Sequence, residues 1–223
     1  CLPVSNGTTA LHLALKTLDI GEDDEVIVPN LTFASPVNSI IHCGAKPVFV
    51  DVKDDFNINE ELIESKITGK TKAIMPVHWA GRMCNMLKIK KIAKKYNLKI
   101  IEDAAQAMGA YYKSKHAGYY SDISAFSCHP LKNLNTLFLT RVKKRNLLIE
   151  HLKKKKIQTM IYYGTPLHFH PAAKKLGYGK GSLKVAEKLK KEVLAFPHHQ
   201  YLRNSEIKYI CKEIKNFYNK YEN

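Results

Sequence analysis

The sequence contains no uninterrupted apolar run of about 18 residues, which is roughly the length that a membrane-spanning helix needs. Its first residues also lack the charged and then apolar pattern of a secretory signal. We therefore expect no membrane segment. The chain opens on Cys-Leu-Pro-Val-Ser, a stretch typical of the interior of a domain, so we expect the large domain to be incomplete at its N-terminus.

Cysteine is scarce and scattered along the chain. There is no CxxC pair among the five cysteines, which are Cys1, Cys43, Cys84, Cys128 and Cys211. Zinc sites and disulfide frameworks depend on paired or clustered cysteines, so this spacing argues against both. We predict no metal site and a location in the reducing cytoplasm.

Arginine is also scarce. Four arginines stand beside 32 lysines, and the formal net charge is +16. The lysines are spread along predicted helices such as 88–95 and 184–191, and aromatic residues are not interleaved with them as in proteins that bind single-stranded nucleic acid. We therefore predict a solvated, lysine-rich surface and no nucleic-acid partner. The second interpretation is attraction of an anionic small-molecule substrate.

Apolar residues make up 45% of the chain, and their spacing alternates between that of strands and that of helices. This alternation predicts an α/β fold with a mostly parallel sheet covered on both faces. The predicted strands lie at 25–29, 47–51, 73–77, 98–103 and 122–126. The predicted helices begin at Thr8 or lie at 34–42, 57–67 and 83–96.

The pattern changes after Asn133 and predicts a second, smaller domain of the α+β type. Its predicted strands lie at 136–142 and 157–163, and its predicted helices at 145–155, 182–193 and 204–220. We therefore divide the chain into a large domain at 1–135 and a small C-terminal domain at 136–223.

Polar and aromatic side chains follow the ends of several predicted strands. Phe33, His78, Asp103 and Ser127 all lie at or just beyond such an end. Because ligands of parallel sheets bind beyond the carboxyl ends of the strands, this shared position predicts that the four residues belong to one site.

Three stretches contain the parts needed to hold pyridoxal 5'-phosphate (PLP). Lys132 follows a predicted strand, Asp103 opens the stretch Asp-Ala-Ala-Gln, and Gly7 with Thr8 begins a helix. An amine can form a Schiff base with PLP, a carboxylate can face its ring nitrogen, and a helix start can bind its phosphate. Each signal is weak alone, because a surface lysine and an ordinary helix cap at Asn6 or Thr8 are the more common explanations.

The motifs together are far more specific, since they occur in a fixed order. The matching stretches of the large domain are Ser-Asn-Gly-Thr-Thr-Ala-Leu at 5–11, Val-Pro-Asn-Leu-Thr-Phe at 28–33, Gly-Ala-Lys-Pro-Val-Phe-Val-Asp at 44–51, Pro-Val-His at 76–78, Glu-Asp-Ala-Ala-Gln at 102–106 and Ser-Cys-His-Pro-Leu-Lys-Asn at 127–133. Those of the small domain lie at 166–168, 176–178 and 185–189. By these motifs the chain resembles the DegT/DnrJ/EryC1 family of PLP-dependent nucleotide-sugar aminotransferases. The resemblance implies the type I PLP fold, which is that of aspartate aminotransferase.

The resemblance implies a role for each matching residue. Lys132 stands at the position of the Schiff-base lysine, and Asp103 at that of the carboxylate against the pyridine nitrogen. Phe33 stands at the position of the aromatic ring that stacks on the cofactor, and Gln106 at a position close to the ring's 3-hydroxyl. Three further residues stand at phosphate-binding positions, namely Gly7, Thr8 and Ser127. We expect His78 and His129 to line the pocket and His168 to reach a sugar substrate.

The family resemblance implies an amino transfer, with L-glutamate as donor, to a nucleotide-linked ketosugar in the synthesis of amino sugars for surface polysaccharide. It also implies a homodimer with a shared active site. Two alternatives stay open, a PLP-dependent sugar dehydratase of the same family and a non-catalytic relative that keeps the fold. Dehydratases of the family carry a histidine at the Schiff-base position, so Lys132 favours transamination.

One departure from the family concerns the chain after its lysine. The family usually continues with a glycine-rich stretch and a long connecting segment, yet no glycine occurs here between Gly118 and Gly164. We therefore expect a long segment to be missing at the junction of Asn135 and Thr136, with a spatial break between those two residues.

Overall fold

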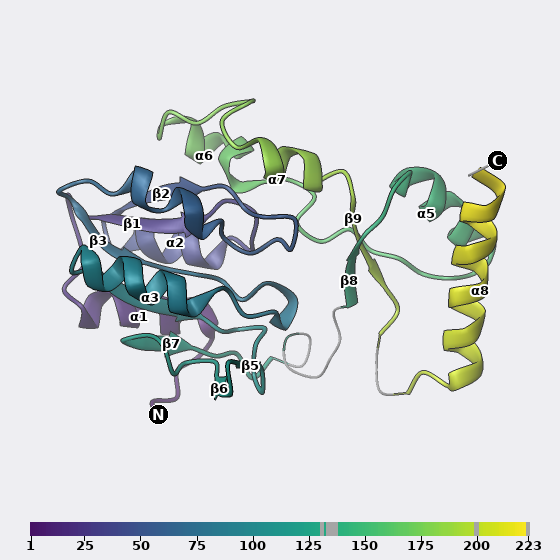
Figure 1. The fold of residues 1–223 in the computed structure, drawn as a ribbon, viewed down its shortest axis with the longest axis horizontal. Coiled ribbons are helices and arrows are strands. Elements are labelled where there is room, and N and C mark those ends of the chain that lie inside the picture. Colours follow the sequence, from purple (N-terminus) through teal and green to yellow (C-terminus); the bar gives the residue numbers. More distant parts are fainter. Residues whose placement is uncertain (130–131, 133–137, 199–200, 222–223) are drawn as a thin grey trace.

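A five-stranded parallel sheet forms the centre of the structure (Figure 1). The computed structural model describes residues 1–129, 132, 138–198 and 201–221. The strand order is β2-β1-β3-β4-β7, and every ladder between these neighbours is parallel. The strands are β1 (Glu25–Pro29), β2 (Lys46–Val50), β3 (Thr71–Ile74), β4 (Lys99–Asp103) and β7 (Ile123–Ala125). The predicted α/β class with a mostly parallel sheet is confirmed.

Helices cover both faces of this sheet. Successive side chains of a strand point to opposite faces, so Val26 and Val28 pack with the helices of one face while Ile27 packs with the helix of the other. All five residues of β1 are buried, as expected for a strand covered on both sides. The helices are α1 (Gly7–Thr17) and α2 (Ser35–His42) on the first face and α3 (Met86–Lys95) on the second.

Side-chain caps fix where these helices begin. The Asn6 side-chain oxygen accepts the backbone N–H of Thr9 at 2.9 Å, and Asn85 does the same for Lys88 at 3.3 Å. Gly44, with φ +87°, follows the end of α2, where a left-handed backbone favours glycine. The sequence therefore predicts these helices to within a few residues.

Residues 57–67 do not form the predicted helix, and that prediction is wrong. Val52 pairs with Ile58 in an antiparallel bridge, which keeps the backbone extended where the helix would begin. Two 3-10 turns follow instead, η1 (Glu60–Leu62) and η2 (Glu64–Lys66). The apolar residues of the segment still reach the core, but through a path that local spacing does not reveal.

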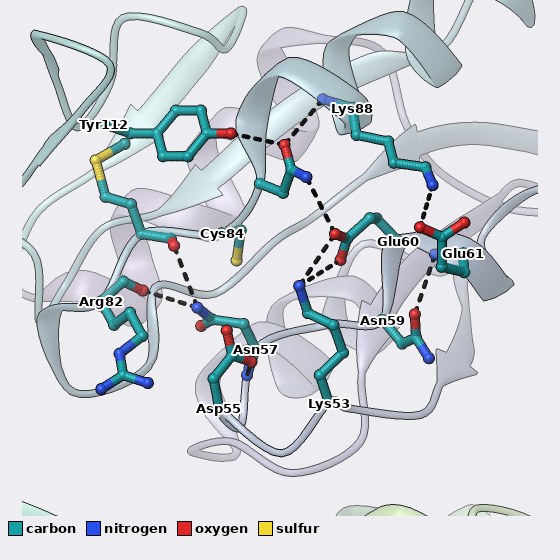
Figure 2. Close-up of polar contacts among 12 residues, drawn as sticks. Lys53, Asp55, Asn57, Asn59, Glu60, Glu61, Arg82, Cys84, Lys88 and Tyr112 are labelled. Atoms are coloured by element: carbon teal, nitrogen blue, oxygen red, sulfur yellow. Dashed lines mark hydrogen bonds and ion pairs between the residues drawn. The ribbon is translucent and has the colours of Figure 1, made fainter.

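A polar network joins this segment to the loop that precedes α3 (Figure 2). The Asn57 side-chain amide donates to the backbone carbonyl of Arg82 at 3.1 Å. The carboxylate of Glu60 lies between the ammonium of Lys53, at 2.8 Å, and the amide of Asn85, at 3.2 Å. The loop from 79 to 85 is therefore tied to the body of the protein from two directions.

The C-terminal part of the chain contains a separate two-stranded sheet. Strand β8 (Phe138–Arg141) pairs antiparallel with β9 (Val193–Phe196), and α5 (Arg145–Lys154) and α8 (Asn204–Tyr221) pack beyond them, away from the central sheet (Figure 1). Phe217 is fully buried in the cluster between these helices and β9.

Two predictions for this part are wrong. The helix predicted at 182–193 is the shorter α7 (Lys184–Leu189), because the chain turns after it and enters β9. The strand predicted at 157–163 makes only one isolated bridge, between Met160 and Ala195. A short hairpin of β5 (Tyr111–Tyr112) and β6 (Lys115–His116) is an addition that the sequence did not predict.

Residues 166–189 pack against the central sheet, although the sequence placed them in the small domain. Leu167 and Leu183 share a buried cluster with α1 and α2, and the Tyr178 hydroxyl accepts the N–H of Phe49 on the edge strand β2. The short helices of this stretch are η4 (Leu167–Phe169), α6 (Pro171–Lys174) and α7. The expected junction between Asn135 and Thr136 lies outside the described residues.

No helix in the described part of the chain is long and apolar enough to cross a membrane.

Asp51, at the end of β2, holds the start of α7 in place. Its carboxylate accepts the backbone N–H groups of Val185 at 2.8 Å and Ala186 at 3.0 Å, and the residue is 6% exposed. A buried carboxylate that receives backbone N–H groups makes hydrogen bonds of the strong, charge-assisted kind. This contact joins two stretches more than a hundred residues apart.

Replacing Asp51 with alanine should lower the free energy of unfolding by about 2 kcal/mol, because the backbone N–H groups of Val52, Val185 and Ala186 would lose their acceptor. Urea unfolding followed by circular dichroism measures the change. Asp54→Ala is the matched control: its carboxylate is 78% exposed and, among the residues that the structure describes, pairs with Arg141 on the surface, so the replacement should cost less than about 1 kcal/mol. Equal losses in the two variants would contradict the capping role of Asp51.

Candidate active site

A cavity of about 370 Å³ lies at the carboxyl ends of the central strands. Its walls come from the loops after β1, β3, β4 and β7 and from the start of α1, where parallel sheets are expected to bind their ligands. The residues that line it are Asn6, Gly7, Thr8, Leu11, Thr32, Phe33, Ser35, Val77, Asp103, Ala105, Gln106, Ser127, His129, Lys132, Tyr162 and Tyr163. Eight of the ten predicted site residues are therefore together in one place.

The first turn of α1 forms one wall of this cavity. Its leading backbone N–H groups have no partners within the helix, and they lie at the positive end of the helix dipole. Thr8 is held by a 2.7 Å hydrogen bond between its hydroxyl and that of Ser35. Ser127 lies beside Gly7, since a Cβ added to this glycine would meet the Ser127 Cβ at 3.8 Å. Hydroxyls and free N–H groups gathered in this way suit an anion such as phosphate.

Asp103 ends β4 and is 5% exposed. One of its oxygens accepts the backbone N–H of Ala105 at 3.0 Å. Burial raises the pKa of the Asp103 carboxyl, while the Ala105 N–H, His78 and Lys132 oppose that rise only in part. A cation placed against this buried carboxyl would stabilise its ionised form. The protonated nitrogen of a pyridine ring is such a cation.

Lys132 lines the same cavity. Burial lowers the pKa of its ammonium group, and the nearby Asp103 carboxylate acts in the other direction. Its Nζ lies 4.6 Å from the centroid of the Phe33 ring. A lysine with a lowered pKa has more of the neutral amine that attacks a carbonyl. Phe33 is 50% exposed, so its aromatic face is free to stack on a flat ligand next to that amine.

Two histidines predicted for the site, His78 in the pocket wall and His168 against a sugar, lie elsewhere in the structure. His78 is fully buried: its Nδ1 accepts the N–H of Cys84 at 3.3 Å, and its Nε2–H donates to Glu102 at 2.8 Å. His168 is 1% exposed and receives the Asn30 amide on Nδ1 while its Nε2–H donates to Glu187. Neither residue lines the cavity, so both are structural anchors rather than substrate contacts. His129 does line it.

Sequence reasoning did not name eight of the sixteen residues of the cavity wall, and of these Tyr162 and Tyr163 lie farthest along the chain from the predicted ones. They come from the second half of the chain, in the stretch that the sequence predicted as a strand. The signal that could have found them was a pair of tyrosines directly before Gly164, where a turn is expected.

The shape and chemistry of the cavity define a class of protein, the PLP-dependent enzymes of the type I fold. A buried carboxyl, a lysine of lowered pKa, an aromatic face and a helix start are brought together at the carboxyl ends of a parallel sheet. These donors fit PLP, because each polar part of the cofactor has a matching group on the wall.

The chain belongs to the DegT/DnrJ/EryC1/StrS aminotransferase family, whose model matches residues 1–140 and again 136–215. It is 30% identical to the "Pleiotropic regulatory protein" of Geobacillus stearothermophilus, over 96% of this chain and 83% of that protein. It is 52% identical to GDP-perosamine synthase of Escherichia coli O157:H7, over 60% of this chain and 37% of the synthase. The predicted family is confirmed, and PLP is the cofactor that family and fold indicate.

Solved structures agree on the fold. The structure superimposes on S. venezuelae DesV with a TM-score of 0.89 at 24% identity, covering 96% of this chain and 83% of DesV. On the PLP form of the putative sugar aminotransferase Spr1654 from Streptococcus pneumoniae, the TM-score is 0.85 at 23% identity, covering 96% and 86%. The predicted type I fold is thereby confirmed.

The comparisons also reveal a difference in length. The match with the Geobacillus protein extends over 310 residues, yet this chain has 223, so the relative has many positions without a counterpart here. The two matches to the family model meet at residues 136–140. The chain also spans only about a third of the GDP-perosamine synthase that it matches.

The raised pKa of Asp103 predicts a pH-dependent effect on stability without cofactor. In the unfolded chain the carboxyl ionises near its ordinary pKa, but in the folded protein ionisation is delayed to higher pH. Stability should therefore fall as pH rises from below the ordinary pKa through the folded pKa. Asp103→Asn keeps the acceptor for Ala105 and removes this charge, so the variant should be more stable than the wild type at pH 7.

Urea unfolding of the cofactor-free proteins between pH 3 and pH 8 measures this effect. The advantage of Asp103→Asn should shrink as pH falls and disappear where the carboxyl is protonated in both states. A variant that is less stable than the wild type at pH 7, or an advantage independent of pH, would contradict the account of Asp103.

Proposed function

We propose that this chain is a PLP-dependent aminotransferase that moves an amino group from L-glutamate to a nucleotide-linked ketosugar. The observation that carries the proposal is the meeting of Lys132, Phe33 and buried Asp103 in one cavity at the strand ends. The 52% identity to a GDP-perosamine synthase supports a nucleotide sugar as substrate. A role in amino-sugar synthesis for surface polysaccharide is consistent with that relationship, and five free cysteines support a cytoplasmic location.

The site residues divide the work of this reaction. PLP, when bound, supplies an electron-withdrawing ring that accepts the electron pair released at the carbon that bears the amine. Asp103 would hold a proton on the ring nitrogen, and Phe33 would cover one face of the ring. Lys132 would hold the cofactor through its amine and would carry protons at that position, because burial lowers the pKa of its ammonium group and so favours the neutral amine.

The start of α1 anchors the cofactor at its other end. Gly7, Thr8 and Ser127 offer backbone N–H groups and hydroxyls to the phosphate, and the helix dipole favours its negative charge. We also propose a homodimer with a shared active site. The half-exposed ring of Phe33 supports it, since an aromatic wall that reaches the surface is well placed for a second copy to cover.

A second candidate is a non-catalytic relative that keeps the fold and binds PLP. The positions of the Geobacillus protein that have no counterpart here favour it, because a segment absent between Asn135 and Thr136 would remove residues next to the site. The name of that relative, a regulatory protein, points in the same direction. The two candidates differ in turnover and agree on cofactor binding.

Replacing Lys132 with alanine should abolish amino transfer, with a fall in rate of about a thousandfold or more, because both the covalent anchor and the proton carrier are lost. The assay mixes protein, PLP, L-glutamate and a 4-keto nucleotide sugar, and follows the amino sugar by mass spectrometry. Lys72→Ala, an exposed lysine on β3, is the matched control and should keep wild-type turnover.

Undiminished turnover by Lys132→Ala would remove this residue from the reaction. A deoxysugar with released ammonia in the wild-type assay would identify a dehydratase instead. Wild-type protein that binds PLP and forms no product from any ketosugar of a panel would select the non-catalytic candidate.

A further inference from the structure

The side-chain amide of Gln106 is held from both ends. Its oxygen accepts the backbone N–H of Ala80 at 2.9 Å, and its Nε2 donates to the Tyr163 hydroxyl at 2.8 Å. If the Gln106 amide were flipped, its NH2 group would face the backbone N–H of Ala80, and neither could accept a hydrogen bond. The contact with Ala80 therefore fixes which end of the amide is nitrogen. A primary amide has a second N–H, and no acceptor for it is found among the residues that the structure describes. Gln106 lines the cavity, so this N–H is available to a ligand there.

The backbone around Gln106 is strained at both of these contacts. Ala80 has φ 50° and Tyr163 has φ 59°, in the left-handed region that residues with side chains seldom adopt. Gly81 adopts φ +80°, and a Cβ on it would lie 2.9 Å from the Gln106 carbonyl oxygen. Strain of this kind persists only where the surrounding structure enforces it, and it gathers at functional sites. Here the two strained residues both contact one glutamine, and the missing Cβ of Gly81 leaves room for the backbone of that glutamine.

Packing around Trp79 enforces this arrangement. The buried indole stacks on Phe56 with ring centroids 4.1 Å apart, and the Tyr163 ring lies against it at 5.9 Å. The Asn57 side-chain oxygen accepts the N–H of Trp79 at 3.1 Å. Its amide donates to the carbonyl of Arg82 (Figure 2). The loop that presents the Ala80 N–H is thus held by Asn57 on both sides of that residue.

We propose that Tyr163 is a positioning residue for the cofactor: by accepting one N–H of Gln106, it aims the other at an oxygen on the ring of bound PLP. The inference rests on the proposed function, since it takes PLP as the occupant of the cavity. Burial raises the pKa of Tyr163 to about 12, so its hydroxyl stays protonated and keeps a lone pair for Gln106 across the neutral range. The second half of the chain thereby acts on a site built by the first half.

Tyr163→Phe removes the hydroxyl and keeps the ring against Trp79. The variant should bind PLP about fivefold to tenfold more weakly, the factor expected for one hydrogen bond to a positioned group. It should also shift the visible absorption of bound PLP, because a loosened donor no longer stabilises the charge on the ring oxygen. Titration followed by absorbance measures both quantities.

The matched control is Tyr120→Phe. Tyr120 is 6% exposed, and its hydroxyl donates to the Tyr112 carbonyl at 2.8 Å, away from the cavity. This variant should lose a similar amount of thermal stability while its affinity for PLP and its absorption stay at wild-type values. Equal PLP affinity and absorption in wild type and Tyr163→Phe would overturn the inference.

A second measurement separates this inference from the proposed function. In cofactor-free protein, Tyr163→Phe and Gln106→Ala should destabilise less together than the sum of the single variants, because each alone breaks the same contact. Strictly additive losses would overturn the contact itself. A third outcome is that the two variants are coupled but the wild-type protein does not bind PLP. That result would show that the contact exists and would refute both the proposed function and the cofactor role of Tyr163.

Discussion

Burial of the parallel sheet on both faces is the constraint on which the rest of the structure depends. Because α1 and α2 cover one face and α3 the other, the strands can expose side chains only at their ends. Asp103, Gln106 and Lys132 are therefore gathered at the carboxyl edge, where the walls around them exclude water. The same exclusion of water raises the pKa of Asp103 and lowers that of Lys132.

The raised pKa of Asp103 and the lowered pKa of Lys132 both mean that burying these charged groups destabilises the folded protein when no ligand in the cavity compensates them. A buried carboxylate and a buried ammonium each cost free energy, and only partial compensation comes from their mutual attraction. The left-handed backbone at Ala80 and Tyr163 adds a further cost of about 1–3 kcal/mol each. A site of this kind gains its stability from the molecule that it binds, as in many proteins that trade stability for function.

Much of the site could be predicted from the sequence because it depends on strand ends and one helix start. Phe33, Asp103 and Ser127 were identified by position alone, and the order of the motifs identified the family. His78 was misplaced because a histidine next to a strand end can point into the core as easily as into a cavity. His168 lies in η4, and its match to a family motif did not show where its ring points. Only the structure shows that Glu102 and Glu187 bind their rings.

Other features could not be predicted because they depend on contacts distant in sequence. The helix expected at 57–67 gives way to the bridge from Val52 to Ile58, and β9 forms because β8 is available to pair with it. Tyr163 and Gln106 are 57 positions apart in the chain, and no local sequence pattern predicts the hydrogen bond between them. Tertiary pairing overrides local propensity in each of these cases.

The most direct measurement of the central claim is peptide mapping after borohydride reduction of the PLP-loaded protein. Reduction fixes PLP to whichever amine holds it, and the chain offers 32 lysines. The account predicts that the label is confined to the peptide that contains Lys132, at one PLP per chain. Label spread over surface lysines, or label on another single lysine, would contradict it.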